Sequence, residues 1–218
     1  VSLSTLLRYD TSQSMDQKTA IKQLKELERL GGVKKMRLAA NGWDAEWKTL
    51  ISIALSARTR DEVVVKVAED LFAEYPTAQA LGQAKLRDVQ KVIYPVNFFR
   101  NKTENIIECE KMLTEKYGGA PPHELPKLVE LPGVGRKTAN VFLSEYGADA
   151  IGVDTHVSYI SQKLGWTRHK DPHKIEKDLQ ALFPTNYWSR VNGACVRFGK
   201  TYMSRRKKDE ILKGILNL

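Results

Sequence analysis

The sequence predicts an all-α protein, and three features carry this prediction. Apolar residues recur at spacings of three and four, the repeat of a helix that buries one face. Alternation of apolar and polar residues, which is typical of half-buried strands, is scarce. No low-complexity tract, internal repeat or Pro/Ser/Gly-rich linker interrupts the pattern. We therefore expect about ten helices joined by short turns.

The first three helices are expected from their apolar stripes and flanking residues. The first stripe ends before two consecutive glycines and consists of Ile21, Leu24, Leu27 and Leu30. The second follows Asp44 and consists of Trp47, Leu50, Ile51, Ala54 and Leu55. The third begins at Asp61 and buries Val64, Val67, Ala68 and Leu71. Segments of the same kind follow at 86–93, 102–117, 125–131, 137–146, 156–164, 175–183, 188–198 and 209–218.

Composition and charge narrow the class of protein. The chain has 218 residues, 42% of them hydrophobic and 28% charged, which excludes disordered and fibrous proteins. Lys and Arg number 35 against 26 Asp and Glu, and the net charge of +9 favours a polyanionic partner. No apolar run approaches the roughly 20 residues that cross a bilayer, and the first residues do not look like a secretion signal. We expect an intracellular protein without membrane contact.

Two cysteines limit metal chemistry. Cys109 and Cys195 lie far apart and cannot supply four thiolates to a zinc or iron–sulfur site. A disulfide between them is the alternative to two reduced core residues, and we expect reduced residues.

One segment, residues 128–139, differs from the helical pattern around it. Pro132 stops one helix, Gly133 and Gly135 bracket the apolar Val134, and a second helix begins at once. Glycines allow backbone geometry closed to other residues and let a partner approach the main chain. Exposed amides at the start of the second helix then form a site for a phosphate. With the basic charge, this predicts a helix-hairpin-helix that binds a nucleic-acid backbone without reading bases.

The segment also resembles a known family. Residues 131–143, LPGVGRKTANVFL, and residues 153–157, VDTHV, resemble the signature of the endonuclease III family of base-excision DNA glycosylases. The likeness extends upstream to residues 54–61 and 101–106. It implies a two-domain helix-hairpin-helix glycosylase fold with DNA in the cleft between the domains. Residues 39–149 would form a six-helix barrel with the hairpin at about 125–146, and residues 1–38 and 150–218 would form the second helical domain.

The resemblance also implies two catalytic residues. Lys137 falls at the family's nucleophile and Asp154 at its acidic partner. A primary amine can attack the sugar C1′ of a flipped nucleotide, expel the base and remain as a Schiff base. Burial and the positive end of the helix would favour the uncharged amine. Asp154, as the N-cap of the helix at His156, should stay ionised and either stabilise oxocarbenium character or help activate the amine.

Further residues are expected at the DNA. The hairpin residues Gly133, Val134, Gly135 and Arg136 would bind the backbone, with Lys102 as another phosphate contact. Arg58 stands where bacterial relatives carry a Gln that fills the gap left by the flipped nucleotide, so its preference among opposite bases should differ.

Three other positions leave alternatives open. Phe98 falls at the family's apolar wedge, and core packing is its alternative role. Tyr159 replaces a basic residue of the relatives, which puts the local phosphate contacts in doubt. The basic run at 205–208 is more often a solvated face than a specific site, although in a DNA protein it adds phosphate contacts.

The family's [4Fe–4S] cluster is not expected, because the chain has no cysteine after Cys195. Met203 stands near the first ligand position, and a final helix would pack Ile211, Leu212, Ile215 and Leu216 in place of the cluster loop. We expect no cofactor and no metal ligands, apart from a monovalent cation that the resemblance suggests at carbonyls of the hairpin.

The function implied is that of a bifunctional DNA glycosylase and AP lyase that removes oxidised pyrimidines from duplex DNA. The partner would be double-stranded DNA with damaged bases or abasic sites, bound by a monomer in the cytoplasm or nucleoid if the source is prokaryotic. A mismatch-specific uracil or thymine glycosylase is the nearest alternative, although such relatives often lack the lysine. A non-catalytic helix-hairpin-helix protein is less favoured, because backbone binding does not need Asp154.

Overall fold

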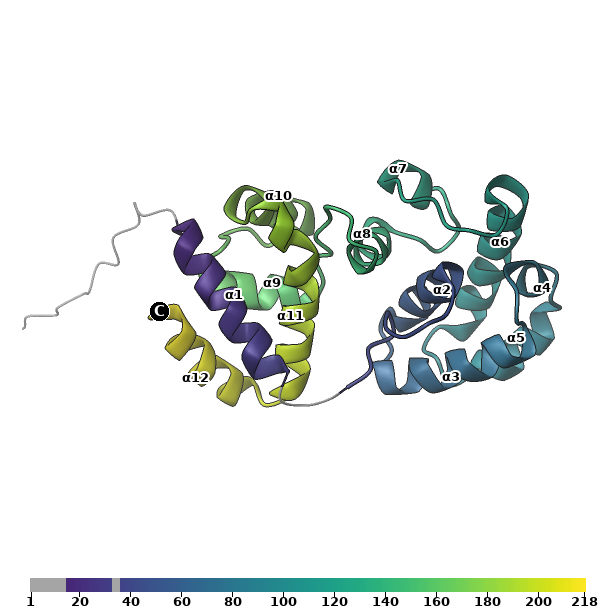
Figure 1. Cartoon of the computed structure of the whole chain (residues 1–218). Helices are drawn as coiled ribbons and strands as arrows, with labels where there is room; N and C mark the ends of the chain where they lie inside the picture. The colour runs from purple at the N-terminus through teal and green to yellow at the C-terminus, as the bar shows by residue number, and fades with distance from the viewer. Residues whose placement is uncertain (1–14, 33–35) are drawn as a thin grey trace, which may run out of the picture.

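A computed structural model describes residues 15–32 and 36–218, and the described residues form helices and no strand (Figure 1). The all-α prediction is confirmed. The helices are α1 Gln17–Gly31, α2 Glu46–Ser56, α3 Asp61–Glu74, α4 Ala78–Gly82, α5 Leu86–Ile93, α6 Phe99–Tyr117, α7 Leu125–Leu128, α8 Arg136–Glu145, α9 Thr155–Lys163, α10 Pro172–Leu182, the 3₁₀ helix η1 Thr185–Tyr187, α11 Trp188–Thr201 and α12 Arg205–Leu216.

Several helix boundaries differ from the expected ones. α6 begins at Phe99 rather than at 102, and α12 begins at Arg205 rather than at 209. Ser204 explains the start of α12, because its hydroxyl accepts a hydrogen bond from the amide of Lys207 as an N-cap. α4 was not predicted, since five residues are too few to display a helical repeat.

One hydrophobic core lies among the helices on the right of Figure 1, α2 to α6, with α7 and α8 against it. Its members come from several helices, so the core joins segments distant in sequence. They include Trp47, Leu50, Leu71, Ile106 and Phe142. Trp43 and Trp47 each set a ring edge-on against Phe72, with centroids 5.0 and 5.1 Å apart.

A second core joins the first helix to the last ones, on the left of Figure 1. It includes Leu24, Leu27, Val157, Ile160, Phe198 and Leu212. The buried indole of Trp166 donates to Gln23 Oε1 at 2.7 Å, which pairs two polar groups inside this core. Residues 1–14 and 33–35 of the predicted second domain lie outside the described residues, and the domain boundaries remain a prediction.

Helix α12 packs against the second core, and only some of its apolar residues are buried as expected. Leu212 and Ile215 are buried and Ile211 is half-buried, but Leu216 is 38% exposed, so its predicted packing is wrong. Met203, just before the helix, is 79% exposed. None of the helices in the described ranges combines the length and apolar character that crossing a membrane demands.

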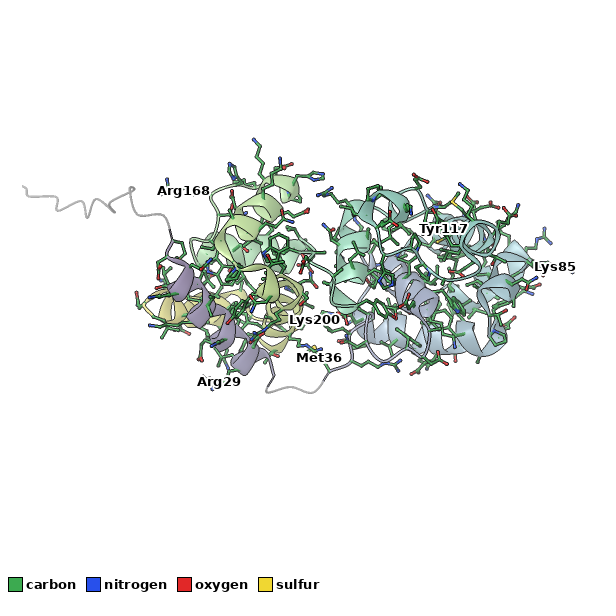
Figure 2. All side chains as sticks on the ribbon, turned by 45° about the horizontal axis from the view of Figure 1, so that its top comes forward. Arg29, Met36, Lys85, Tyr117, Arg168 and Lys200 are labelled. Atoms are coloured by element: carbon green, nitrogen blue, oxygen red, sulfur yellow. The ribbon has the colours of Figure 1, made fainter. Side chains whose placement is uncertain are left out.

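Polar side chains join the two groups of helices. Lys200 of α11 forms an ion pair with Asp61 at the start of α3, and both side chains are largely buried. Figure 2 shows Lys200 at the boundary between the two groups. Arg197 donates to Asn41 Oδ1 at 3.1 Å, and Asn41 in turn donates to Glu145 at 2.9 Å. These contacts fix the orientation of the helices that carry the candidate site.

Candidate active site

The hairpin between α7 and α8 is built by its backbone. The amide of Leu131 donates to the carbonyl of Leu128, and the amide of Val134 donates to that of Leu131 at 3.0 Å. This turn ends α7 at Leu128 rather than at 131, the expected end. The side chain of Val134 is buried and anchors the turn.

The two glycines of the hairpin serve different purposes. Gly133 has φ +75°, and a Cβ there would lie 2.8 Å from Asn105 Cβ, so only glycine fits. Gly135 has φ −81° and ψ 170°, which any residue adopts, and a Cβ there would meet no atom within 4 Å. The expectation that Gly135 needs special backbone geometry is wrong. Its missing side chain keeps the approach to the main chain open.

The N-terminus of α8 is uncapped. Gly135 is the N-cap residue and offers no side-chain acceptor to the first amides of the helix. These amides and the positive end of the helix dipole together favour an anion at this point.

Lys137 is the second residue of α8 and is exposed. The expectation that the Lys137 side chain is buried is therefore wrong, because the end of the helix presents the side chain to solvent. An exposed amine is available to a molecule that approaches the hairpin.

Asp154 is half-buried and caps α9, as predicted. Its Oδ1 accepts a hydrogen bond from the amide of Val157 at 2.8 Å, while Oδ2 has no hydrogen-bond partner among the described residues. The cap fixes the carboxylate at the positive end of α9 and leaves one oxygen for other contacts.

Packing brings the Asp154 segment against the face of α8 that carries Lys137. Asn140 and Val141 lie three and four residues after Lys137, on the same helix face. Asn140 donates to the carbonyl of Ile151 at 3.3 Å, and a Cβ on Gly152 would lie 2.4 Å from Val141 Cγ2. Only glycine permits this approach, which directs the chain past α8 toward Asp154.

Arg136 does not point freely toward solvent. Its Nε and Nη2 donate to the two carboxylate oxygens of Glu176 in α10, at 3.0 and 2.8 Å. Glu176 is nearly buried. The expected contact of Arg136 with DNA stays a prediction, and in this structure a bidentate pair with Glu176 uses two of the guanidinium N–H groups. Sequence reasoning missed Glu176, and nothing in its local pattern marks it.

Arg58 and Phe98 come together as neighbours on two loops. Both have a left-handed backbone, with φ 57° and 61°, and they are the non-glycine residues at positive φ in the described chain. The guanidinium of Arg58 lies 5.6 Å from the ring centroid of Phe98. Phe98 is 59% exposed, so its alternative role in core packing is wrong, whereas the next residue, Phe99, packs against the first core.

Lys102 lies behind these loops. Its Nζ donates to the carbonyls of Leu55 and Ala57 at 2.7 and 2.6 Å. Burial lowers the pKa of this amine to about 8. The structure thus directs the side chain toward protein acceptors, and the predicted phosphate contact is not observed.

Positive side chains gather around Tyr159, the residue that replaces a basic one. Lys163, Lys208 and Arg205 lie 5.6 to 5.8 Å from its ring centroid. The hydroxyl of Tyr159 donates to Asp209. Lys163 of α9 and two residues of α12 therefore place basic charge around the position where Tyr159 replaces a basic residue.

His156 packs closely against α11. A Cβ on Gly199 would lie 2.1 Å from its Nδ1, so the glycine lets α11 approach the ring. Burial lowers the pKa of this imidazole.

The cysteines do not fit an iron–sulfur cluster. Cys109 belongs to the first core and Cys195 to the second, and burial raises the pKa of both thiols. No group of three His, Cys, Asp or Glu suited to a metal ion occurs in the part of the chain that the structure describes. The donor set present therefore lacks the ligands that such a cluster needs.

The chain is all-α, has two hydrophobic cores, and places a lysine just after a hairpin whose second helix has an uncapped N-terminus. These features are typical of one class of protein, the helix-hairpin-helix DNA glycosylases. Residues 51–185 match the model of the HhH-GPD superfamily of base excision DNA repair proteins. Endonuclease III of Thermotoga maritima is 44% identical over 155 residues, which cover 71% of this chain and 73% of the relative.

Solved structures agree with this family. A trapped covalent intermediate of endonuclease III with DNA matches with a TM-score of 0.79 and 32% identity, over 88% of this chain and 90% of the other. A thermostable thymine-DNA glycosylase matches with a TM-score of 0.74 at 18% identity, over 87% and 91%, and shares the fold. The chain belongs to the endonuclease III family. It is a base-excision-repair DNA glycosylase with AP lyase activity.

Proposed function

We propose that the protein removes oxidised pyrimidines from duplex DNA through Lys137 and then cleaves the strand at the abasic site by β-elimination. The observation that carries this proposal is the exposed amine of Lys137 behind the hairpin, on the face of α8 against which the Asp154 segment packs. The endonuclease III relatives support the reaction class.

The amine of Lys137 acts as the nucleophile. Its nitrogen lone pair forms a bond to the sugar C1′ while the glycosidic bond breaks. The base leaves with the electron pair of the glycosidic bond and takes up a proton. Opening of the sugar ring gives a protonated imine with the lysine. Loss of a C2′ proton then expels the 3′ phosphate, and water releases the lysine from the imine.

The carboxylate of Asp154 is the acidic partner of this reaction. Its Oδ2, which has no partner among the described residues, is available to positive charge that develops at C1′. The same oxygen is also available to a proton from the lysine amine. Both roles require the ionised form of the carboxylate.

The hairpin binds the DNA backbone in this proposal. The free amides at the start of α8 receive a phosphate, and Arg136 stays with Glu176. Arg58 and Phe98 enter the duplex where the damaged nucleotide has left the stack. The protein acts as a monomer, which size-exclusion chromatography checks.

Borohydride trapping tests the catalytic assignment. Wild type should become covalently linked to a duplex with an abasic site, and Lys137→Ala should lose both trapping and strand cleavage while it keeps affinity for the duplex. Lys91→Ala is the matched control, because Lys91 is exposed and paired with Asp88 on α5. Normal cleavage by Lys137→Ala would refute the assignment.

A panel of duplexes tests the lesion class. Duplexes with thymine glycol, dihydrouracil or uracil opposite guanine are compared by rates of base release. Faster release of thymine glycol and dihydrouracil supports the proposal. Preference for uracil opposite guanine would instead favour a mismatch glycosylase.

A further inference from the structure

Two short loops that carry exposed residues at positive φ lie side by side. The first joins α2 to α3 and holds Arg58, and the second joins α5 to α6 and holds Phe98. Positive φ is unfavourable for residues with a Cβ, so each loop needs contacts that hold it in this conformation.

Asn97 ties the second loop to the first. Its side-chain amide donates to the carbonyl of Arg58 at 2.5 Å, and its backbone amide donates to Thr59 Oγ1 at 3.1 Å. Asn97 therefore links the second loop to the backbone of Arg58, which has positive φ, and to the side chain of Thr59.

Lys102 adds a second link from beneath. It lies in the first turn of α6, where its backbone amide donates to the carbonyl of Phe98 at 3.1 Å. Its Nζ reaches across to the first loop and contacts Leu55 O, Ala57 O and Thr59 Oγ1, at 2.7, 2.6 and 3.4 Å. One residue thus contacts the backbone of Phe98 at one end and the loop of Arg58 at the other.

The hydrogen-bond capacity of Lys102 is used within the protein. An ammonium group has three N–H donors, and three loop oxygens lie around this one. Leu55 and Ala57 lie at the C-terminal end of α2, where helix carbonyls lack internal partners and favour a positive charge. No carboxylate lies within ion-pair distance of Nζ among the described residues.

We propose that Lys102 is a positioning residue that holds the Arg58 and Phe98 loops together for insertion into the duplex, and is not a phosphate contact. The inference rests on the proposed function, because it assumes that these two residues enter the DNA. In this proposal Lys102 influences the preference for the opposite base indirectly, because it positions Arg58.

Salt dependence separates the two roles. A phosphate contact contributes about 0.9 to the slope of log affinity against log salt concentration, on damaged and undamaged DNA alike. A positioning residue leaves this slope unchanged, and its loss affects the duplex into which the loops insert.

The experiment uses Lys102→Met, which keeps an unbranched apolar stem of similar length and removes the ammonium with all three donors. Affinity is measured across a salt series for an unmodified duplex and for duplexes with an uncleavable abasic analogue opposite each of the four bases. Affinity for the analogue should fall about tenfold, as expected for a lost charged hydrogen-bond group, with the salt slope unchanged. The differences among opposite bases should shrink to about twofold.

Two further variants guard the conclusion. Lys66→Met removes an exposed lysine from α3 and controls for the loss of one positive charge. Adding Lys102→Met to Arg58→Ala should not change the opposite-base ranking further if the lysine acts through Arg58. An additive effect would show a merely structural role and overturn the proposal.

If Lys102→Met fails to fold, Thr59→Val decides the question, because it removes the hydroxyl shared by Asn97 and Lys102. A flattened opposite-base ranking supports the proposal, and an unchanged one overturns it. A lower salt slope and equal losses on all duplexes for Lys102→Met would make the lysine a phosphate contact. Borohydride trapping of wild type reports on the proposed function separately, so failure of one does not imply failure of the other.

Discussion

Glu110 gives the protein an unusual dependence of stability on pH. This residue of α6 is fully buried, and neither of its carboxylate oxygens has a hydrogen-bond partner among the described residues. Burial raises the pKa of its carboxyl from 4.5 to about 8. The group is therefore mostly neutral in the folded protein at neutral pH, while it is ionised in the unfolded chain.

The sign and size of the effect follow from this difference. Between about pH 4.5 and 8, the folded protein holds a proton that the unfolded chain has released, so the free energy of unfolding falls as the pH rises. Each pKa unit corresponds to about 1.4 kcal/mol, and a difference of about 3.5 units corresponds to about 5 kcal/mol across the window. That is a large part of the 5 to 15 kcal/mol typical of a folded domain.

Urea denaturation of wild type and Glu110→Gln, followed by circular dichroism between about pH 5 and 8.5, measures the effect. The glutamine keeps the shape of the neutral acid and does not titrate. It should match wild type near pH 5 and exceed its free energy of unfolding by several kcal/mol near pH 8.5. The difference between the two proteins cancels other titrations, such as that of His156. Parallel curves would refute the reasoning.

Three further predictions concern the hairpin and the cofactor. Gly135→Ala should keep the melting temperature and weaken binding to damaged and undamaged duplexes alike, whereas Gly133→Ala should lose about 1 to 3 kcal/mol of stability, because φ is positive and Asn105 is in the way. A lesion-specific effect of Gly135→Ala would make the hairpin a structural turn. Glu176→Gln frees Arg136 and should steepen the salt slope of DNA binding by about 0.9. An unchanged slope would mean that Arg136 already leaves Glu176 when wild type binds DNA, or that Arg136 does not reach the DNA backbone. Metal analysis of the purified protein should find no iron, and stoichiometric iron would contradict the cysteine argument.

Helices were predictable from sequence because burial imposes a period on apolar residues. α5 was predicted with its observed bounds, and Asp61 was identified as the start of α3. The predicted helix boundaries were wrong where a polar capping residue determines the start of the helix. Ser204 was a recognisable cap that the apolar pattern of α12 did not include, and α4 is too short to have a pattern.

The hairpin was predictable because its geometry is local. Pro132 and the glycines determine the turn within a few residues, so the sequence indicates an exposed backbone. The cap at Asp154 is local in the same sense, because its acceptor and the amide of Val157 are three residues apart. The reasons assigned to the glycines were less accurate, since the clash at Gly133 comes from Asn105 on another helix.

Charge was the least predictable property of the site, because a sequence counts cations without showing their partners. Lys102 and Arg136 were both assigned to phosphate, yet loop carbonyls surround the first and Glu176 binds the second. The net charge of +9 therefore overstates the positive charge available at the hairpin. Backbone amides can still bind a phosphate at the hairpin without any cation. The neighbouring basic side chains can therefore form contacts within the protein without loss of phosphate binding.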